Sequence, residues 1–196
     1  MGCGKSSVGR KLSQLLCCPF MDLDSVIEER EGRSIPEIFA SDGEAAFRQM
    51  ELDTLQNILR EVGRQSAPPV PSHSRAASPS PIVLSLGGGT VMTPECAELV
   101  REKTTCIYLR ASVDTLASRL ASEAEGRPLL KQASHPGSTD SNNSPNVSAA
   151  DLRSRIESLM SRRASTYEAT AHITIDTDDL SIDEIAQTLA TKVKIR

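Results

Sequence analysis

MGCGKSS, residues 1–7, matches the second half of the phosphate-binding loop pattern G-x-x-x-x-G-K-[ST]. In such loops, backbone N–H groups and the N-terminus of the following helix hold phosphate oxygens. Lys5 would neutralise the outer phosphates, and the Ser6 hydroxyl would bind Mg²⁺. The helix that this site needs is predicted over residues 5–16, where one face is apolar: Val8, Leu12, Leu15 and Leu16.

The composition excludes several classes of protein. A net charge of −4 argues against a nucleic-acid partner, and 3% aromatic residues without Trp argue against stacking platforms for bases. The five cysteines contain no C-x-x-C pair, which argues against a zinc site. No apolar run has the length of a membrane span, and free thiols without a signal peptide favour the cytoplasm.

Strand and helix patterns alternate along the chain. Continuous apolar runs predict strands over residues 19–24, 82–86, 105–109 and 172–176. Helical patterns or capping signals begin near residues 25, 34, 44, 93, 112, 149 and 181, and Gly63 is predicted to end the helix that starts at residue 44. Alternation with apolar strands indicates an α/β fold, a parallel sheet with helices on both faces.

Ligands of such folds bind at the carboxyl ends of the strands. These ends carry Asp22 and Asp24, Gly87 to Gly89, and Arg110, a set that suits Mg²⁺ and phosphate. Two stretches rich in Ser and Pro, residues 66–81 and 133–148, are predicted to be insertions without a role in the core. A solvated D-x-D, a surface arginine or a plain linker would explain each polar motif separately, but not their order.

That order resembles the shikimate kinase family. The matching stretches lie outside the two insertions and include GCGKSSVGRKLS, PFMDLDSVIEEREGRSIPEIFASDGEAAFRQME, LSLGGGTVM, IYLRAS, GRPLL and RRASTYEATAHITIDTD. The resemblance implies one kinase domain over residues 1–196, with substrate-binding helices at 24–63, a disordered insertion at 66–81 and a lid at 123–148. It also implies a three-layer fold like that of nucleoside monophosphate kinases, with strand order 2-3-1-4-5.

In that family the first, central strand precedes the phosphate-binding loop, so the resemblance implies that this strand is missing from the chain. A central strand buries about five apolar side chains, each worth roughly 1.5–3 kcal/mol. We therefore expect a chain that starts at Met1 to fold poorly. The simplest explanation is a start codon assigned too late, and the alternative is a degenerate protein.

The resemblance implies a reaction in chorismate and aromatic amino acid biosynthesis, the transfer of the ATP γ-phosphoryl group to the 3-hydroxyl of shikimate. Mg²⁺ would be bound by Ser6 directly and by Asp22 through water. Arg127 would close on the phosphates with the lid, and Arg119 would stack on adenine. The residues implied in ATP binding are Gly2, Cys3, Gly4, Lys5, Ser6, Ser7, Arg119 and Arg127.

For shikimate, the resemblance implies that Asp24 acts as general base while Lys5 and Arg127 stabilise the transferring group. Arg48, held by Glu51, would bind the shikimate carboxylate together with Arg163; Arg162 is the alternative, because Ser165-Thr166 replaces the usual Pro-Leu before Tyr167. Backbone N–H groups and a ring wall would come from Gly88, Gly89, Phe39 and Phe47.

Two other functions stay open at this point. One is a non-catalytic relative that folds against a partner supplying the missing strand, and the other is a related kinase of a small molecule such as gluconate. Arg48 and Arg163 argue against gluconate, because two arginines suit an acid with a ring. We expect a monomer that binds ATP and shikimate and has neither nucleic-acid nor membrane partners.

Overall fold

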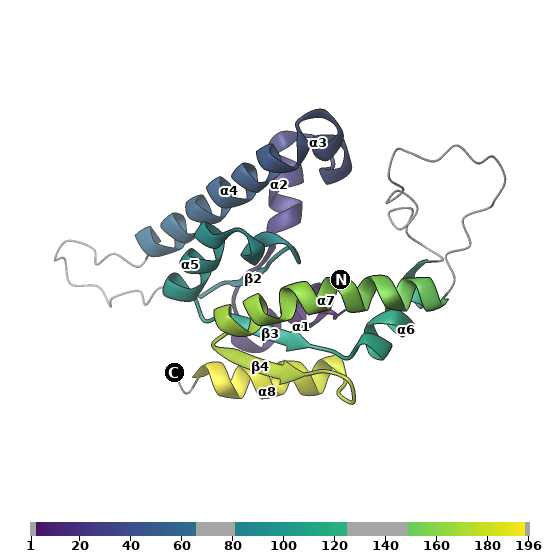
Figure 1. Cartoon of the computed structure of the whole chain (residues 1–196). Helices are drawn as coiled ribbons and strands as arrows, with labels where there is room; N and C mark the ends of the chain where they lie inside the picture. Colours follow the sequence, from purple (N-terminus) through teal and green to yellow (C-terminus); the bar gives the residue numbers. More distant parts are fainter. Residues whose placement is uncertain (1–2, 66–80, 125–148, 195–196) are drawn as a thin grey trace.

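The computed structural model describes residues 3–65, 81–124 and 149–194. The element order is α1 (Lys5–Leu16), β1 (Phe20–Asp22), α2 (Leu23–Glu31), α3 (Ile35–Ser41), α4 (Gly43–Gln65), β2 (Val83–Ser85), the 3₁₀ turn η1 (Thr90–Met92), α5 (Pro94–Lys103), β3 (Ile107–Arg110), α6 (Val113–Ala124), α7 (Ala149–Thr170), β4 (Ile173–Asp176) and α8 (Ile182–Lys194) (Figure 1). Gly2, Arg127, the insertion at 66–80 and most of the predicted lid lie outside the described residues.

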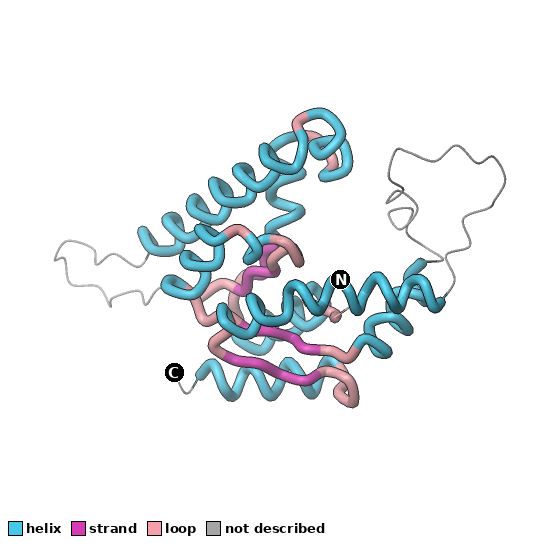
Figure 2. Tube along the Cα trace, viewed as in Figure 1, coloured by secondary structure: helices cyan, strands magenta, loops and turns pink. Residues whose placement is uncertain are grey.

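The strands form two parallel pairs. β1 pairs with β2, with Phe20 opposite Val83, and β3 pairs with β4, with Ile107 opposite Ile173. The strands are the magenta parts of the tube in Figure 2, and within the described ranges no strand joins β2 to β3. The parallel α/β architecture is confirmed, whereas a missing central strand stays a prediction.

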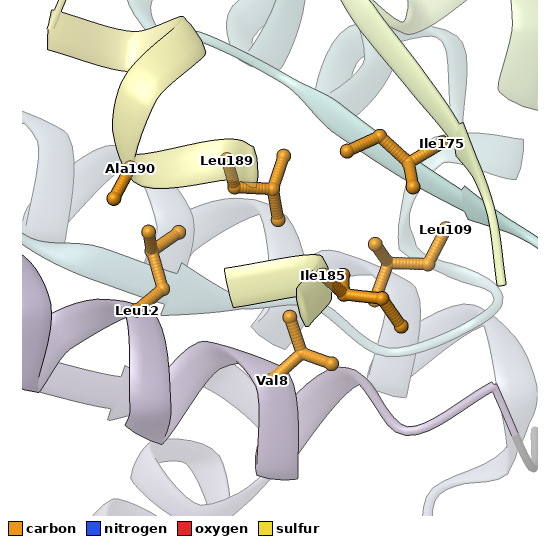
Figure 3. Close-up of a cluster of buried hydrophobic side chains, with 7 residues drawn as sticks. All are labelled: Val8, Leu12, Leu109, Ile175, Ile185, Leu189 and Ala190. Atoms are coloured by element: carbon orange, nitrogen blue, oxygen red, sulfur yellow. The ribbon is translucent and has the colours of Figure 1, made fainter. Parts of the chain in front are cut away.

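One face of the strands is covered by α1 and α8. Val8 and Leu12 of α1 meet Leu109, Ile175 and the apolar side of α8 in a buried cluster (Figure 3). The seven residues drawn are Val8, Leu12, Leu109, Ile175, Ile185, Leu189 and Ala190. Their spacing along both helices is the 3–4 residue repeat of an apolar helix face, so burial of this stripe holds α1 beneath the sheet.

The opposite face is covered by α4, α5 and α7. Leu84 of β2 contacts apolar clusters that include side chains of α4 and α5. Tyr108 of β3 lies against Tyr167 of α7, with ring centroids 5.2 Å apart. The strands therefore lie between two layers of helices, which is the predicted three-layer arrangement.

A group of three helices, α2 to α4, extends from the end of the β1–β2 pair (Figure 1). A capping box starts α3: the Ser34 N–H donates to Oε2 of Glu37 at 2.7 Å. Leu23, Ile27 and Ile38 are fully buried between these helices. This packing fixes the first turn of α2 and the first half of α4, where the charged residues of the site lie.

Two predicted boundaries are wrong. Gly63 does not end the helix: α4 continues to Gln65, and the position has a helical conformation without positive φ. The helix predicted from residue 25 is α2, and it begins at Leu23. The Asp22 carboxylate accepts the backbone N–H of Asp24 at 3.2 Å and so caps the start of this helix. Within the described ranges, no helix is long and apolar enough to cross a membrane.

Candidate active site

At the start of α1, the backbone N–H groups of residues 5–7 have no hydrogen-bond acceptor among the described residues. Gly4 has φ +76°, a left-handed conformation that favours glycine, and it turns the chain into the helix. The first helical hydrogen bond is donated by the Val8 N–H to the Gly4 carbonyl, at 2.9 Å. The N–H groups of residues 5–7 therefore point out of the helix end, as an anion-binding turn requires.

Ser6 and Asp22 meet beside this turn. The Ser6 hydroxyl donates to Oδ2 of Asp22 at 3.0 Å, across the start of α1 and the end of β1. Hard oxygen ligands from one hydroxyl and one carboxylate suit Mg²⁺, which keeps several waters and takes other ligands from phosphates. In the described part of the chain no cluster of three or more His, Cys, Asp or Glu could hold a metal, so a site supplied wholly by such side chains is not present there.

Asp24 is half-buried in the first turn of α2. Burial raises the pKa of its carboxyl group, and the nearby carboxylates of Asp22 and Glu51 raise it further, whereas Lys5 lowers it. These influences place Asp24 within electrostatic reach of both the Lys5 ammonium and the buried carboxylate of α4. A desolvated carboxylate beside a phosphate-binding lysine is a candidate proton acceptor.

Arg48 is held from two sides on α4. Its Nη1 donates to Oε2 of Glu51 at 2.5 Å, and its Nη2 donates to Oε1 of Glu44 at 3.0 Å. The Glu51 side chain is 1% exposed and that of Glu44 is 69% exposed, so only one partner is sheltered from water. The guanidinium also lies 5.5 Å from the ring centroid of Phe47.

The glycine loop after β2 lets charged groups approach its backbone. A Cβ on Gly87 would lie 2.8 Å from Oδ1 of Asp24, and a Cβ on Gly89 would lie 2.7 Å from Nη1 of Arg48. At either position a side chain would force the neighbouring carboxylate or guanidinium to move away. The glycines are therefore needed for the close contacts of Asp24 and Arg48 with the loop.

Gly88, between these two glycines, is bound by α7. Its carbonyl accepts the hydroxyl of Tyr167 at 2.5 Å and Nη1 of Arg163 at 3.3 Å. Arg162 is exposed, whereas Arg163 is half-buried against the loop, so the structure favours Arg163 for a role at the site. Within the described ranges the N–H groups of Gly88 and Gly89 have no hydrogen-bond partner, so both can serve a ligand.

Phe39 and Phe47 have different surroundings. Their ring centroids lie 4.7 Å apart, but Phe39 is 37% exposed and Phe47 only 4%. That both rings wall a ligand stays a prediction. Phe39 offers a surface, and Phe47 supports it from the core.

Two further arginines are bound by neighbouring elements. Arg119 Nη2 donates to the Thr177 carbonyl at 2.9 Å, which ties α6 to the loop after β4. Arg110, at the end of β3, pairs with Asp176, with Nε 2.5 Å from Oδ1. Stacking of Arg119 on adenine stays a prediction, since the structure contains no base.

An apolar cavity of about 130 Å³ lies between the phosphate-binding turn, the glycine loop, β3 and the inner faces of α6 and α7. Cys3 and Lys5 line it from the turn, and Leu86 and Gly88 from the loop. Lys5 Nζ lies 3.8 Å from the Cys3 sulfur at its rim. The walls are mostly apolar, and the charged residues among those that line the cavity are Lys5 and Arg163.

Three residues that take part in the contacts of the site were not predicted from the sequence. The Thr90 hydroxyl donates to Oε1 of Glu51 at 2.7 Å, Tyr167 bonds to Gly88, and Glu44 holds the outer side of Arg48. Glu44 could have been found, because it lies four residues before Arg48 on the same helix. Thr90 and Tyr167 reach partners 39 and 79 residues away, and no local pattern carries that information.

Known proteins are similar to this chain in sequence and in fold. A family model described as shikimate kinase matches residues 1–64 and 73–194. The shikimate kinase of Chlorobium chlorochromatii (strain CaD3) is 37% identical over 193 residues, which are 98% of this chain and 86% of the relative. That of Thioalkalivibrio sulfidiphilus (strain HL-EbGR7) is 36% identical over 190 residues, 97% of this chain and 81% of the relative.

Solved structures agree with this result. The shikimate kinase from Acinetobacter baumannii in complex with shikimate has a TM-score of 0.73 and 26% identity, and the match covers 100% of this chain and 89% of that chain. The enzyme from Bacteroides thetaiotaomicron has a TM-score of 0.74 and 25% identity, covering 99% and 94%. With the match of the family model over nearly its whole length, the chain belongs to the shikimate kinase family.

Proposed function

We propose that this protein is an ATP-dependent shikimate kinase that phosphorylates the 3-hydroxyl of shikimate, a step toward chorismate and the aromatic amino acids. One observation carries the proposal: three successive glycines contact three charged residues suited to this acceptor. Gly87 adjoins Asp24, Gly88 is bonded by Arg163, and Gly89 adjoins Arg48. The loop thus gathers one carboxylate and two guanidinium groups.

Arg48 and Arg163 would bind the carboxylate of shikimate, because a planar guanidinium matches a carboxylate in charge and shape. Glu51 would keep Arg48 in place throughout, whereas the exposed Glu44 is a partner that an incoming carboxylate can replace. Phe39 would contact the ring. Gly88 and Gly89 would donate their N–H groups to the acceptor.

Asp24 would accept the proton of the 3-hydroxyl as its oxygen bonds to the γ-phosphorus of ATP. The bond from that phosphorus to the β–γ bridging oxygen breaks, and ADP leaves. Such transfers depend mainly on positioning and on charge neutralisation. A base with a raised pKa suits this role, since it takes up a proton more readily than an ordinary Asp.

The turn from Gly2 to Ser7 would hold the ATP phosphates, with Lys5 at the outer ones. Ser6 directly and Asp22 through water would hold Mg²⁺, which neutralises phosphate charge when bound. Arg127 would close over the phosphates from the lid, and Arg119 would contact the base. A monomer in the cytoplasm, without nucleic-acid or membrane partners, completes the proposal.

The test is a coupled ADP-release assay of the purified protein with ATP and Mg²⁺, offering shikimate or gluconate as acceptor. We expect turnover with shikimate and none with gluconate. Phosphorus NMR of the product should show a new phosphate monoester. Turnover with gluconate alone would replace the proposed acceptor, and shikimate binding without turnover would indicate a non-catalytic relative.

A further inference from the structure

Glu51 is a buried carboxylate on α4 at the centre of a short chain of contacts. Its side chain is 1% exposed, and each carboxylate oxygen has a different partner. Oε2 accepts Nη1 of Arg48 at 2.5 Å, and Oε1 accepts the hydroxyl of Thr90 at 2.7 Å. A buried charge is tolerated only when its oxygens are satisfied, so both donors are needed.

Thr90 is fully buried at the first position of η1. Its backbone N–H donates to the Gly87 carbonyl at 3.3 Å, and its hydroxyl lies 3.1 Å from where a Cβ of Gly87 would be. Thr90 therefore belongs to the glycine loop by its backbone and to the α4 charge pair by its side chain. It is the only hydroxyl that the described residues place on Glu51.

We propose that Thr90 is a positioning residue for the substrate carboxylate, acting through Glu51 on Arg48. The inference rests on the proposed function, in which Arg48 binds that carboxylate. Thr90 fixes the rotamer of Glu51, and Glu51 then presents Arg48 against Gly89. The same link keeps the glycine loop at a constant distance from α4, so loop and guanidinium meet the substrate as one preorganised unit.

Removing the Thr90 hydroxyl should change the orientation of the Arg48 guanidinium. In Thr90→Val the shape of the side chain is kept, but Oε1 of Glu51 loses its donor in a site without water access. The carboxylate is then expected to rotate toward Arg48 or toward solvent, which changes the angle of the guanidinium. Glu44 cannot replace Glu51 as a support, because it is 69% exposed and its bond to Arg48 competes with water.

The experiment compares Thr90→Val with Thr90→Ser in steady-state kinetics. A matched control is Thr170→Val, since Thr170 is also buried, at 5% exposure, but its hydroxyl bonds within α7 to the Thr166 carbonyl. For Thr90→Val we expect the KM for shikimate to rise about tenfold and the KM for ATP to change less than about twofold. Thr90→Ser should restore most of the affinity, and Thr170→Val should leave both constants near the parent values.

An unchanged KM for shikimate in Thr90→Val would overturn the inference, as would equal impairment of Thr90→Ser, which points to the methyl group. Equilibrium unfolding supplies a readout without substrate: Thr90→Val and Arg48→Met should be non-additive, although the two side chains share only Glu51. Additive losses would also overturn the inference. A parent protein inactive on shikimate would refute the proposed function, and the unfolding cycle would still decide the role of Thr90.

Discussion

The surroundings of Asp24 disfavour the ionised form of its carboxyl group. Burial and neighbouring carboxylates raise the pKa of this group in the folded chain above its usual value of 3.8. Between 3.8 and the raised value the folded state binds the proton more tightly than the unfolded state, so this group lowers stability as pH rises through that window. Under the proposed function this cost falls on the catalytic base, and such a trade-off between stability and activity is common in active sites.

We therefore predict opposite effects of Asp24→Asn on stability and on turnover. At pH 7 the melting temperature should rise, because the charge is removed, and the difference should vanish well below pH 3.8, where Asp24 is protonated in both states. Under the proposed function, kcat should fall by about 10²- to 10⁴-fold through loss of the base. Thermal unfolding across pH and steady-state kinetics measure the two effects; a lower melting temperature at pH 7 would contradict the first.

Because Gly89 has no side chain, the Arg48 guanidinium can lie close to its backbone. In Gly89→Ala the new Cβ would lie 2.7–3.0 Å from the guanidinium of Arg48. Since this group ends a flexible side chain, we expect the protein to fold with Arg48 displaced and the KM for shikimate raised about ten- to a hundredfold. Gly89→Ala in an Arg48→Ala background should cause little further loss; a second loss of the same size would show that Gly89 acts otherwise.

At the scale of elements, two helical glycines have contrasting environments. A Cβ on Gly9 of α1 would lie 2.6 Å from the ring of Phe20 on β1, whereas a Cβ on Gly63 of α4 would meet nothing within 4 Å. Gly9 thus lets α1 lie close against β1, which places Ser6 beside Asp22. Gly63 is exposed in the last turns of its helix and has no packing role.

The same substitution should therefore have opposite signs at the two positions. Gly63→Ala should stabilise the protein by about 0.5–1 kcal/mol, the gain in helix propensity. Gly9→Ala gains the same propensity but should lose about 1–3 kcal/mol to overpacking, which leaves it destabilised. Urea unfolding of both variants measures the difference, and a stabilised Gly9→Ala would mean that Phe20 moves aside freely.

At the scale of the whole molecule, β2 and β3 each have one edge that pairs with no other strand in the described part of the chain. The Val83 N–H donates to the Pro19 carbonyl, toward β1. Successive residues of a strand point their backbone groups to opposite sides, so those of Leu84 point away from β1. By the same alternation, those of Ile107 and Leu109 point away from β4, since Cys106 and Arg110 bond in its direction. The apolar cavity lined by Leu86, Ile107 and Leu109 lies beside these edges.

We predict that this space accepts an extended apolar strand. Cys3 lines the same cavity, so a run of five apolar residues followed by Gly-Ser, fused before Met1, would reach it. Pairing with both edges and burial of several side chains at roughly 1.5–3 kcal/mol each should raise the melting temperature by many degrees. A fusion of equal length made of Ser and Gly is the control, and equal melting temperatures would contradict the prediction.

The sequence by itself determined the local secondary structure. The helix at residues 5–16, the capping boxes at Ser34 and Ser181 and the parallel strand pattern depend on contacts within one or two turns, or on periodic burial. The order of short motifs was enough to recognise the family. Gly63 was misread because glycine only weakens a helix, and packing of the rest of α4 outweighs that cost.

Only the tertiary structure decided how the charged residues are held. It brought Arg163 to the Gly88 carbonyl, set Phe47 behind Phe39, and joined Thr90 to Glu51 across 39 residues of sequence. Such contacts arise where separate helices and loops are brought together by burial of their apolar faces. The bond directions and close approaches that result depend on the whole packed arrangement, so no stretch of sequence encodes them alone.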